Sequence, residues 1–127
     1  MLDTTEAIKE KMVLACKVLQ NQGMVDGYGH LTARLPDNRI LSTPHMRPGK
    51  VALRDIIVID AQGKKLEGFG EPNGETAMHT SIYKARPDVS CILHYHPERA
   101  RGSEHYQSRN QGCRQLRRAV LSRHAYL

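Results

Sequence analysis

The chain has 127 residues, a mass of 14.3 kDa and a formal net charge of +6. No apolar stretch approaches the length needed to cross a membrane, and the first residues lack the basic and apolar regions of a secretory signal. We therefore expect neither a membrane protein nor a secreted one. Three scattered cysteines, Cys16, Cys91 and Cys113, indicate a reducing compartment, and the expected location is cytoplasmic.

Positive charge is concentrated near the C-terminus. Residues 1–97 carry twelve basic and eleven acidic side chains, whereas residues 98–127 carry seven arginines and two acids. We expect residues 1–97 to form one domain and residues 98–127 a basic, irregular or disordered tail. Nucleic-acid binding is not expected of this tail, because only Tyr106 and Tyr126 could stack on bases.

The first predicted element is a helix near the N-terminus. Asp3 and Glu6 stand at the spacing of a capping box, and apolar residues recur at helical spacing until Gly23 ends the run. The members of this apolar face are Ile8, Met12, Ala15, Cys16 and Leu19. The pattern predicts a helix that buries this face in the core.

A sheet is predicted to follow. Residues 31–35 and 40–41 have the pattern of two antiparallel strands, joined by a turn at residues 36–38. The continuous apolar run at residues 56–59 predicts a strand buried on both faces, and residues 61–64 turn it into a further strand at residues 65–67. Helices on both sides of a mixed or antiparallel sheet are therefore expected.

A second helix is predicted to begin at Glu75, after a turn at Pro72 and Gly74, and to end at Pro87. The helix dipole favours an ionised carboxylate at Glu75, which could serve as a general base beside a metal ion or be an ordinary first-turn acid. His79 shares the helix face of Glu75 and could orient it, lie near a metal, or pack against the sheet with one hydrogen bond. We favour the packing role.

The next strand carries two histidines two residues apart. Residues 89–93 alternate as a strand should, and they lead into His94, Tyr95 and His96. Side chains two apart point to one face of a strand, so His94 and His96 can present two imidazoles to one metal ion. Paired surface histidines without a ligand role are the alternative.

These residues, taken in order, resemble the class II aldolase/adducin family from about Thr5 to Pro97. The matching segments are residues 29–32, 42–44, 57–60 with Gly63, Glu75 with His79, 86–88 and 94–97. The resemblance implies an α/β fold, a three-layer α/β/α sandwich that is incomplete at the C-terminus. It further implies a divalent metal held by His94, His96 and a later histidine, with Glu75 as acid/base. Zinc is expected first, with manganese or magnesium as alternatives.

The resemblance also implies a reaction class and an assembly. Members cleave or form carbon–carbon bonds in sugar phosphates, epimerise them, or decarboxylate hydroxy acids, and they form homo-oligomers. Breaking a bond beside a carbonyl leaves negative charge on an enediolate or enolate, which a bound metal stabilises. A small hydroxy-carbonyl or hydroxy-carboxylate substrate is therefore expected.

The anion-binding turns depart from the sugar-phosphate aldolases of that family. Gly29 is followed by His30, where those enzymes have asparagine, and the loop after Thr43 is longer and contains Arg47. Gly29, His30, Thr43 and Arg47 are the predicted substrate contacts, and the planar guanidinium of Arg47 suits a carboxylate. A solvated Arg47 and a hydrogen-bonded turn role for His30 are the alternatives.

Residues 98–127 do not resemble the second half of the family, which suggests a truncated or frame-shifted member. His105 and His124 lie in no stretch that resembles the third-ligand motif. We expect a metal-dependent carbon–carbon lyase, which truncation could leave inactive. The alternative is a non-catalytic binding module like the adducin head, or a truncated remnant.

Overall fold

The computed structural model describes residues 3–25 and 28–96. Along the chain these form α1 (Thr5–Asn21), β1 (Gly29–Arg34), β2 (Ile40–Ser42), η1 (Pro48–Lys50), η2 (Leu53–Asp55), β3 (Ile57–Ile59), β4 (Lys65–Glu67), α2 (Thr76–Ala85) and β5 (Cys91–Tyr95). The predicted tail at residues 98–127 lies outside the described residues. Within the described ranges, no helix is both long enough and apolar enough to cross a membrane.

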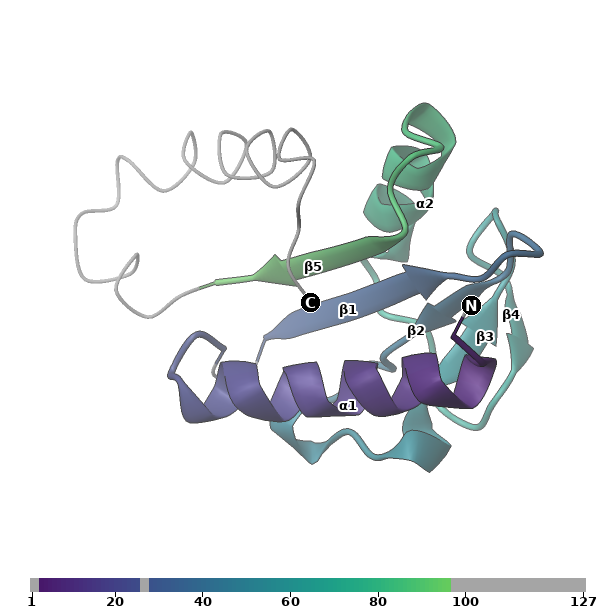
Figure 1. Cartoon of the computed structure of the whole chain (residues 1–127). Helices are drawn as coiled ribbons and strands as arrows, with labels where there is room; N and C mark the ends of the chain where they lie inside the picture. Colours follow the sequence, from purple (N-terminus) through teal and green to yellow (C-terminus); the bar gives the residue numbers. More distant parts are fainter. Residues whose placement is uncertain (1–2, 26–27, 97–127) are drawn as a thin grey trace, which may run out of the picture.

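The described strands form one sheet in the order β4-β3-β2-β1-β5, and every neighbouring pair is antiparallel. Helix α1 packs on one face of the sheet and α2 on the other (Figure 1). The three-layer α/β/α prediction is therefore confirmed, and the sheet is antiparallel throughout the described part. The β1–β2 hairpin, the buried strand β3 and its partner β4 were predicted correctly, β3 from its continuous apolar run and β4 from the turn that precedes it.

The core has two halves, one on each face of the sheet. On the α1 side, Met12, Val13 and Cys16 of the helix contact Leu31 and Ala33 of β1. On the α2 side, a second cluster is formed by Ile40, Ile57, Ile59, Tyr83 and Ile92. Each fully buried aliphatic side chain contributes about 1.5–3 kcal/mol of transfer free energy. The two clusters show which way the side chains of β1 and β5 point. Odd-numbered residues of these strands face α1, and even-numbered residues face α2.

The N-terminus of α1 differs from the prediction. The helix cap is Thr4, whose hydroxyl oxygen accepts a hydrogen bond from the Ala7 amide at 3.2 Å. The carboxylate of Asp3 instead pairs with Lys11 at 2.6 Å, so the predicted capping role of Asp3 is wrong. A threonine one residue further on provides the same oxygen chemistry, which is why spacing alone misplaced the cap.

A single arginine joins β1 to the end of α2. Arg34 donates from Nη1 to the Tyr83 carbonyl at 3.2 Å, and from Nη2 to the carbonyls of Arg86, Pro87 and Val89. Its guanidinium carbon also lies 5.0 Å from the centre of the Tyr83 ring. The segment between α2 and β5 is therefore fixed against the sheet, and this segment determines where β5 begins.

Candidate metal centre

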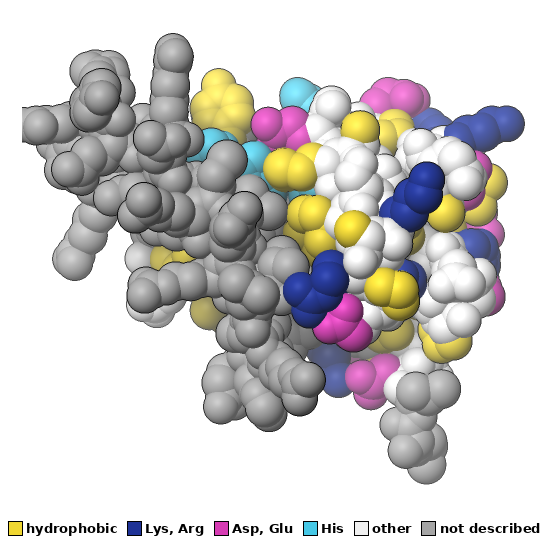
Figure 2. Space-filling model, turned by 90° about the horizontal axis from the view of Figure 1, so that it is seen from above, with side chains coloured by type: hydrophobic (Ala, Val, Ile, Leu, Met, Phe, Trp, Pro, Cys, Tyr) yellow, Lys and Arg dark blue, Asp and Glu magenta, His cyan; other side chains and the backbone are white. Residues whose placement is uncertain are grey.

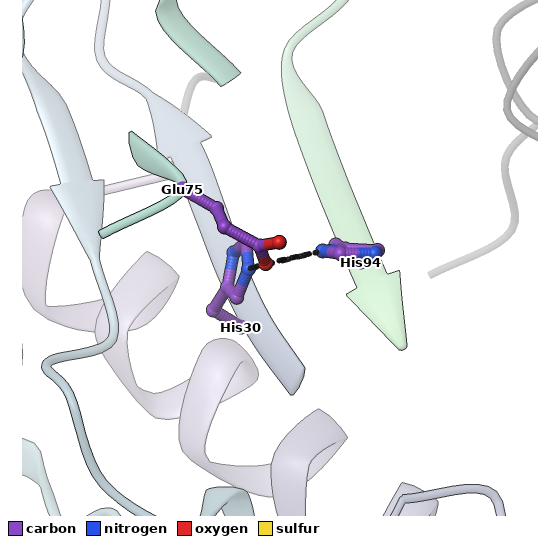
Figure 3. Close-up of side chains that lie close together, drawn as sticks. All are labelled: His30, Glu75 and His94. Carbon is purple, nitrogen blue, oxygen red and sulfur yellow. Dashed lines mark hydrogen bonds and ion pairs between the residues drawn. The ribbon is translucent and has the colours of Figure 1, made fainter. Parts of the chain in front are cut away.

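Three side chains from three separate elements converge on one point at the α2 face of the sheet. His30 lies on β1 and His94 on β5, and the two residues are direct partners in the antiparallel register. Glu75 immediately precedes α2, at the helix N-cap position. Figure 3 shows its carboxylate between the two imidazoles. The sheet and the helix start therefore build the cluster together.

The three ligand atoms form a nearly equilateral triangle. Glu75 Oε2 lies 2.8 Å from His30 Nε2 and 3.0 Å from His94 Nδ1, and the two nitrogens are 3.1 Å apart. The His30 side chain is 3% exposed, that of His94 17% and that of Glu75 57%. In the space-filling view, histidine side chains reach the surface beside an acidic one (Figure 2). The cluster is thus buried on the His30 side and open on the Glu75 side.

Burial and hydrogen bonding set the charges of the cluster. The pKa of His30 is lowered, mainly because burial disfavours the imidazolium. The pKa of Glu75 is also lowered, and its hydrogen bond with His30 is the largest cause. At neutral pH, Glu75 is therefore a carboxylate and His30 a neutral imidazole. That is the protonation state in which both can bind a cation.

His79 lies beneath the cluster and is completely buried. Its Nδ1 is hydrogen-bonded to the Thr32 hydroxyl at 2.7 Å, and that hydroxyl also contacts the Tyr83 hydroxyl at 2.9 Å. Its Nε2 has no hydrogen-bond partner among the described residues. The ring packs 4.6 Å from the His30 ring, between centroids. The predicted role for His79, packing with one hydrogen bond, is confirmed.

The predicted pair His94 and His96 is adjacent in space. The two ring centroids are 4.8 Å apart, as expected for side chains on one face of a strand. His96 is exposed and does not belong to the compact set of described His, Cys, Asp and Glu residues whose ligand atoms all lie within 4.8 Å of one another. That set is His30, Glu75 and His94. The roles of His94 and His96 as metal ligands stay predictions.

The position of His30 next to Glu75 was not foreseen. Sequence reasoning placed His30 among the substrate contacts, because it follows a turn, and gave it no relation to Glu75 or His94. The missing information was the pairing of β1 with β5, which sets His30 opposite His94. Pairing the two predicted strands antiparallel and comparing the possible registers could have placed His30 opposite His94.

The other predicted substrate contacts lie around the same end of the sheet or in its loops. Gly29 has a φ of +143°, and a Cβ there would come within 3.2 Å of the His94 carbonyl oxygen, so glycine permits the close approach of β1 and β5. Thr43 is 2% exposed, and its hydroxyl accepts a hydrogen bond from the Leu31 amide at 3.0 Å. Arg47 is exposed in the loop before η1. Their contact with substrate stays a prediction.

The donor set fits a divalent metal ion. Histidine nitrogens and a carboxylate oxygen are ligands that zinc accepts, and three protein ligands leave one position open, as in catalytic zinc sites. Tetrahedral zinc bonds of 2.0–2.1 Å correspond to donor separations of about 3.3 Å, a few tenths of an ångström above the observed sides of the triangle. Manganese and magnesium prefer more oxygen ligands.

A wide open groove lies elsewhere on the described surface, around the Pro44–Pro72 bridge, with a volume of about 870 Å³. Phe69, Met46 and Glu71 are among its lining residues, whereas His30, Glu75 and His94 are not. We place the chemistry at the histidine cluster and not in this groove, because the cluster combines convergent ligand atoms with shifted pKa values.

Comparison with known proteins identifies relatives. The model of the class II aldolase and adducin N-terminal domain matches residues 10–110. A 3,4-dihydroxyphthalate decarboxylase of Arthrobacter keyseri is 33% identical over 107 residues, covering 76% of this chain and 43% of that protein. A methylthioribulose-1-phosphate dehydratase of Methylococcus capsulatus is 35% identical over 88 residues, covering 68% of this chain and 43% of that protein.

Solved structures agree with the sequence comparison. The crystal structure of YgbL from Klebsiella pneumoniae superimposes with a TM-score of 0.70 and 29% identity, covering 76% of this chain and 47% of that chain. The chain thus spans less than half the length of these relatives. The family match covers most of the chain and includes all three residues of the cluster. This chain belongs to the class II aldolase and adducin family.

Proposed function

We propose that this chain carries the metal-binding part of a lyase acting on a small hydroxy-carbonyl or hydroxy-carboxylate compound. The observation that carries the proposal is the 3.0 Å approach of the Glu75 carboxylate to His94, from two different elements and on a side open to solvent. His94 and His96 are the proposed histidine ligands, and Glu75 is the acid/base. Zinc is the proposed metal, with manganese or magnesium as alternatives.

Each residue has a defined task in this proposal. The metal, when bound, supplies a Lewis acid that stabilises negative charge on a carbonyl oxygen. Glu75, which its lowered pKa keeps ionised and which is 57% exposed, would accept the proton of the substrate hydroxyl as the carbon–carbon bond breaks. It would then return that proton to the enolate carbon left when CO₂ departs. Arg47 is proposed to bind a carboxylate of the substrate, and Gly29 and Thr43 to line the turn beside it.

The relatives guide the choice of reaction. One is a decarboxylase and another a dehydratase, and dehydration was not among the reactions suggested by the sequence alone. Decarboxylation and dehydration beside a carbonyl share the need to stabilise an enolate-like charge. We favour decarboxylation of a hydroxy-carboxylate, because Arg47 offers a fork for the carboxylate. Cytoplasmic location and homo-oligomer formation are further expectations from the family.

A non-catalytic binding module, like the adducin head, is the second candidate. The observation that favours it is the matched length, since the chain spans 43% of both the decarboxylase and the dehydratase relative. Such a module would keep the fold and the cluster but lack turnover. The two candidates therefore differ in activity and not in structure.

Turnover distinguishes them. The zinc-loaded chain is incubated with a panel of hydroxy-carboxylates and sugar phosphates, and released CO₂, aldehyde or dehydrated product is measured. We expect Glu75→Gln to lower the rate by about 10²–10⁴-fold, because the general base is lost. Glu71→Gln, a change of the same kind at an acid paired with Lys65, is the matched control and should retain the rate. Absence of turnover in the zinc-loaded parent would favour the binding module.

A further inference from the structure

We propose that His30 is itself a metal ligand in addition to His94 and His96, and that Glu75, at the third corner of the cluster with His30 and His94, contacts the metal when no substrate is bound. This inference rests on the proposed function, since it assigns a further ligand to the same metal. It concerns a residue that sequence reasoning gave to the substrate, and it places a third protein ligand within the described part of the chain.

The geometry of the triangle is the first argument. Three contacts join three atoms, two of them imidazole nitrogens and one a carboxylate oxygen. If both nitrogens carry a proton, both donate to Glu75 and the 3.1 Å contact between them is repulsive. If only one nitrogen carries a proton, the lone pair of the other nitrogen faces the carboxylate oxygen, and that contact is repulsive. While Glu75 is a carboxylate, no placement of protons on the two rings makes all three contacts hydrogen bonds, whereas one cation above the triangle can be bound by all three atoms.

The immobility of His30 is the second argument. Its side chain is 3% exposed, its ring packs 4.6 Å from the buried His79 ring, and its backbone is paired with β5. Its Nε2 is therefore held in place at the cluster before a metal ion binds. A ligand that loses little conformational freedom on binding gives a tighter metal site than a mobile one.

The electrostatic character of the cluster is the third argument. The carboxylate of Glu75 lies between the two imidazoles, where its oxygen attracts a dication. Glu75 and His94 form the exposed side of the triangle, so an ion can enter from solvent while His30 closes the far side. The open coordination position then faces outward, where a substrate oxygen could bind.

Zinc titration of the 127-residue chain by calorimetry tests this inference, with His30→Gln as the decisive variant. Glutamine places an amide donor near the position of the histidine Nε2, so it can keep the hydrogen bond to Glu75 while removing the imidazole ligand. If His30 is a ligand, we expect zinc affinity to fall by about 100-fold or more. His45→Gln, at an exposed loop histidine, is the matched control and should bind zinc as the parent does.

A second readout follows the ring itself. In ¹³C,¹⁵N-labelled parent protein, addition of zinc should shift the Nε2 resonance of His30, which is assigned by correlating its ring with its own backbone in the parent. This measurement needs only the parent to be folded. Parent-like zinc affinity in His30→Gln, or an unshifted His30 resonance in the zinc-loaded parent, would overturn the inference and leave the proposed function standing. Absence of zinc binding by the parent would overturn both.

Discussion

Acid should destabilise the folded chain by about 3 kcal/mol between about pH 6.5 and about pH 4 through His79 alone. Burial, the largest cause, together with the nearby His30 and His94, lowers the pKa of His79 to about 3 in the folded chain. An unfolded histidine has a pKa of about 6.5. The unfolded chain therefore binds one more proton than the folded chain within this window, and stability is lost as the pH falls through it.

Urea unfolding at a series of pH values measures this loss, and His79→Asn isolates it. Asparagine can keep the hydrogen bond to Thr32 but has no proton to take up. Glu75 and His30, whose lowered pKa values also favour unfolding in acid, are present in both proteins and cancel in the comparison. We expect the variant to be less stable at neutral pH but to lose less stability in acid. Parallel pH profiles would show that His79 does not cause the acid loss.

Arg34→Met should lower the free energy of unfolding by about 2–4 kcal/mol, the second large effect we expect. Methionine keeps most of the apolar stem but removes the guanidinium, which donates to carbonyls at four positions from Tyr83 to Val89. Those carbonyls then lose their shared donor in a half-buried environment, and the segment between α2 and β5 is released. Urea unfolding at neutral pH measures the change.

Arg39→Met is the matched control for this prediction. Arg39 pairs with Asp37 and Glu67 on the surface of the β1–β2 hairpin, where ion pairs contribute little. We expect a clearly smaller loss there than in Arg34→Met, because solvent screens the exposed pairs. Equal losses in the two variants would mean that the carbonyl contacts of Arg34 contribute no more than an exposed ion pair.

Much of the fold could be predicted from the sequence because local patterns determine it. Three local patterns each predict one kind of element, with bounds accurate to a few residues. They are the alternation in β1, the continuous apolar run of β3 and the turn before Glu75. The cap of α1 was misplaced because Asp3 and Thr4 offer equivalent oxygens one residue apart. Only the final geometry, in which Asp3 reaches Lys11, distinguishes them.

The candidate site was predictable only in part. Glu75 and the histidine pair His94 and His96 were identifiable from spacing along one helix start and one strand. His30 was recognised as polar but not as a neighbour of Glu75 or His94, since 45 residues separate it from Glu75 and only the pairing of β1 with β5 sets it opposite His94. Non-local strand pairing is the step that sequence periodicity does not determine.

We propose that this chain binds a divalent metal at the cluster of Glu75, His30, His94 and His96. Mass spectrometry of metal bound to the purified chain, after incubation with zinc and removal of excess, tests it most directly beside a His94→Ala/His96→Ala variant. We expect about one equivalent of zinc in the parent and a large loss in the variant. A parent free of metal, or a variant that keeps as much zinc as the parent, would contradict it.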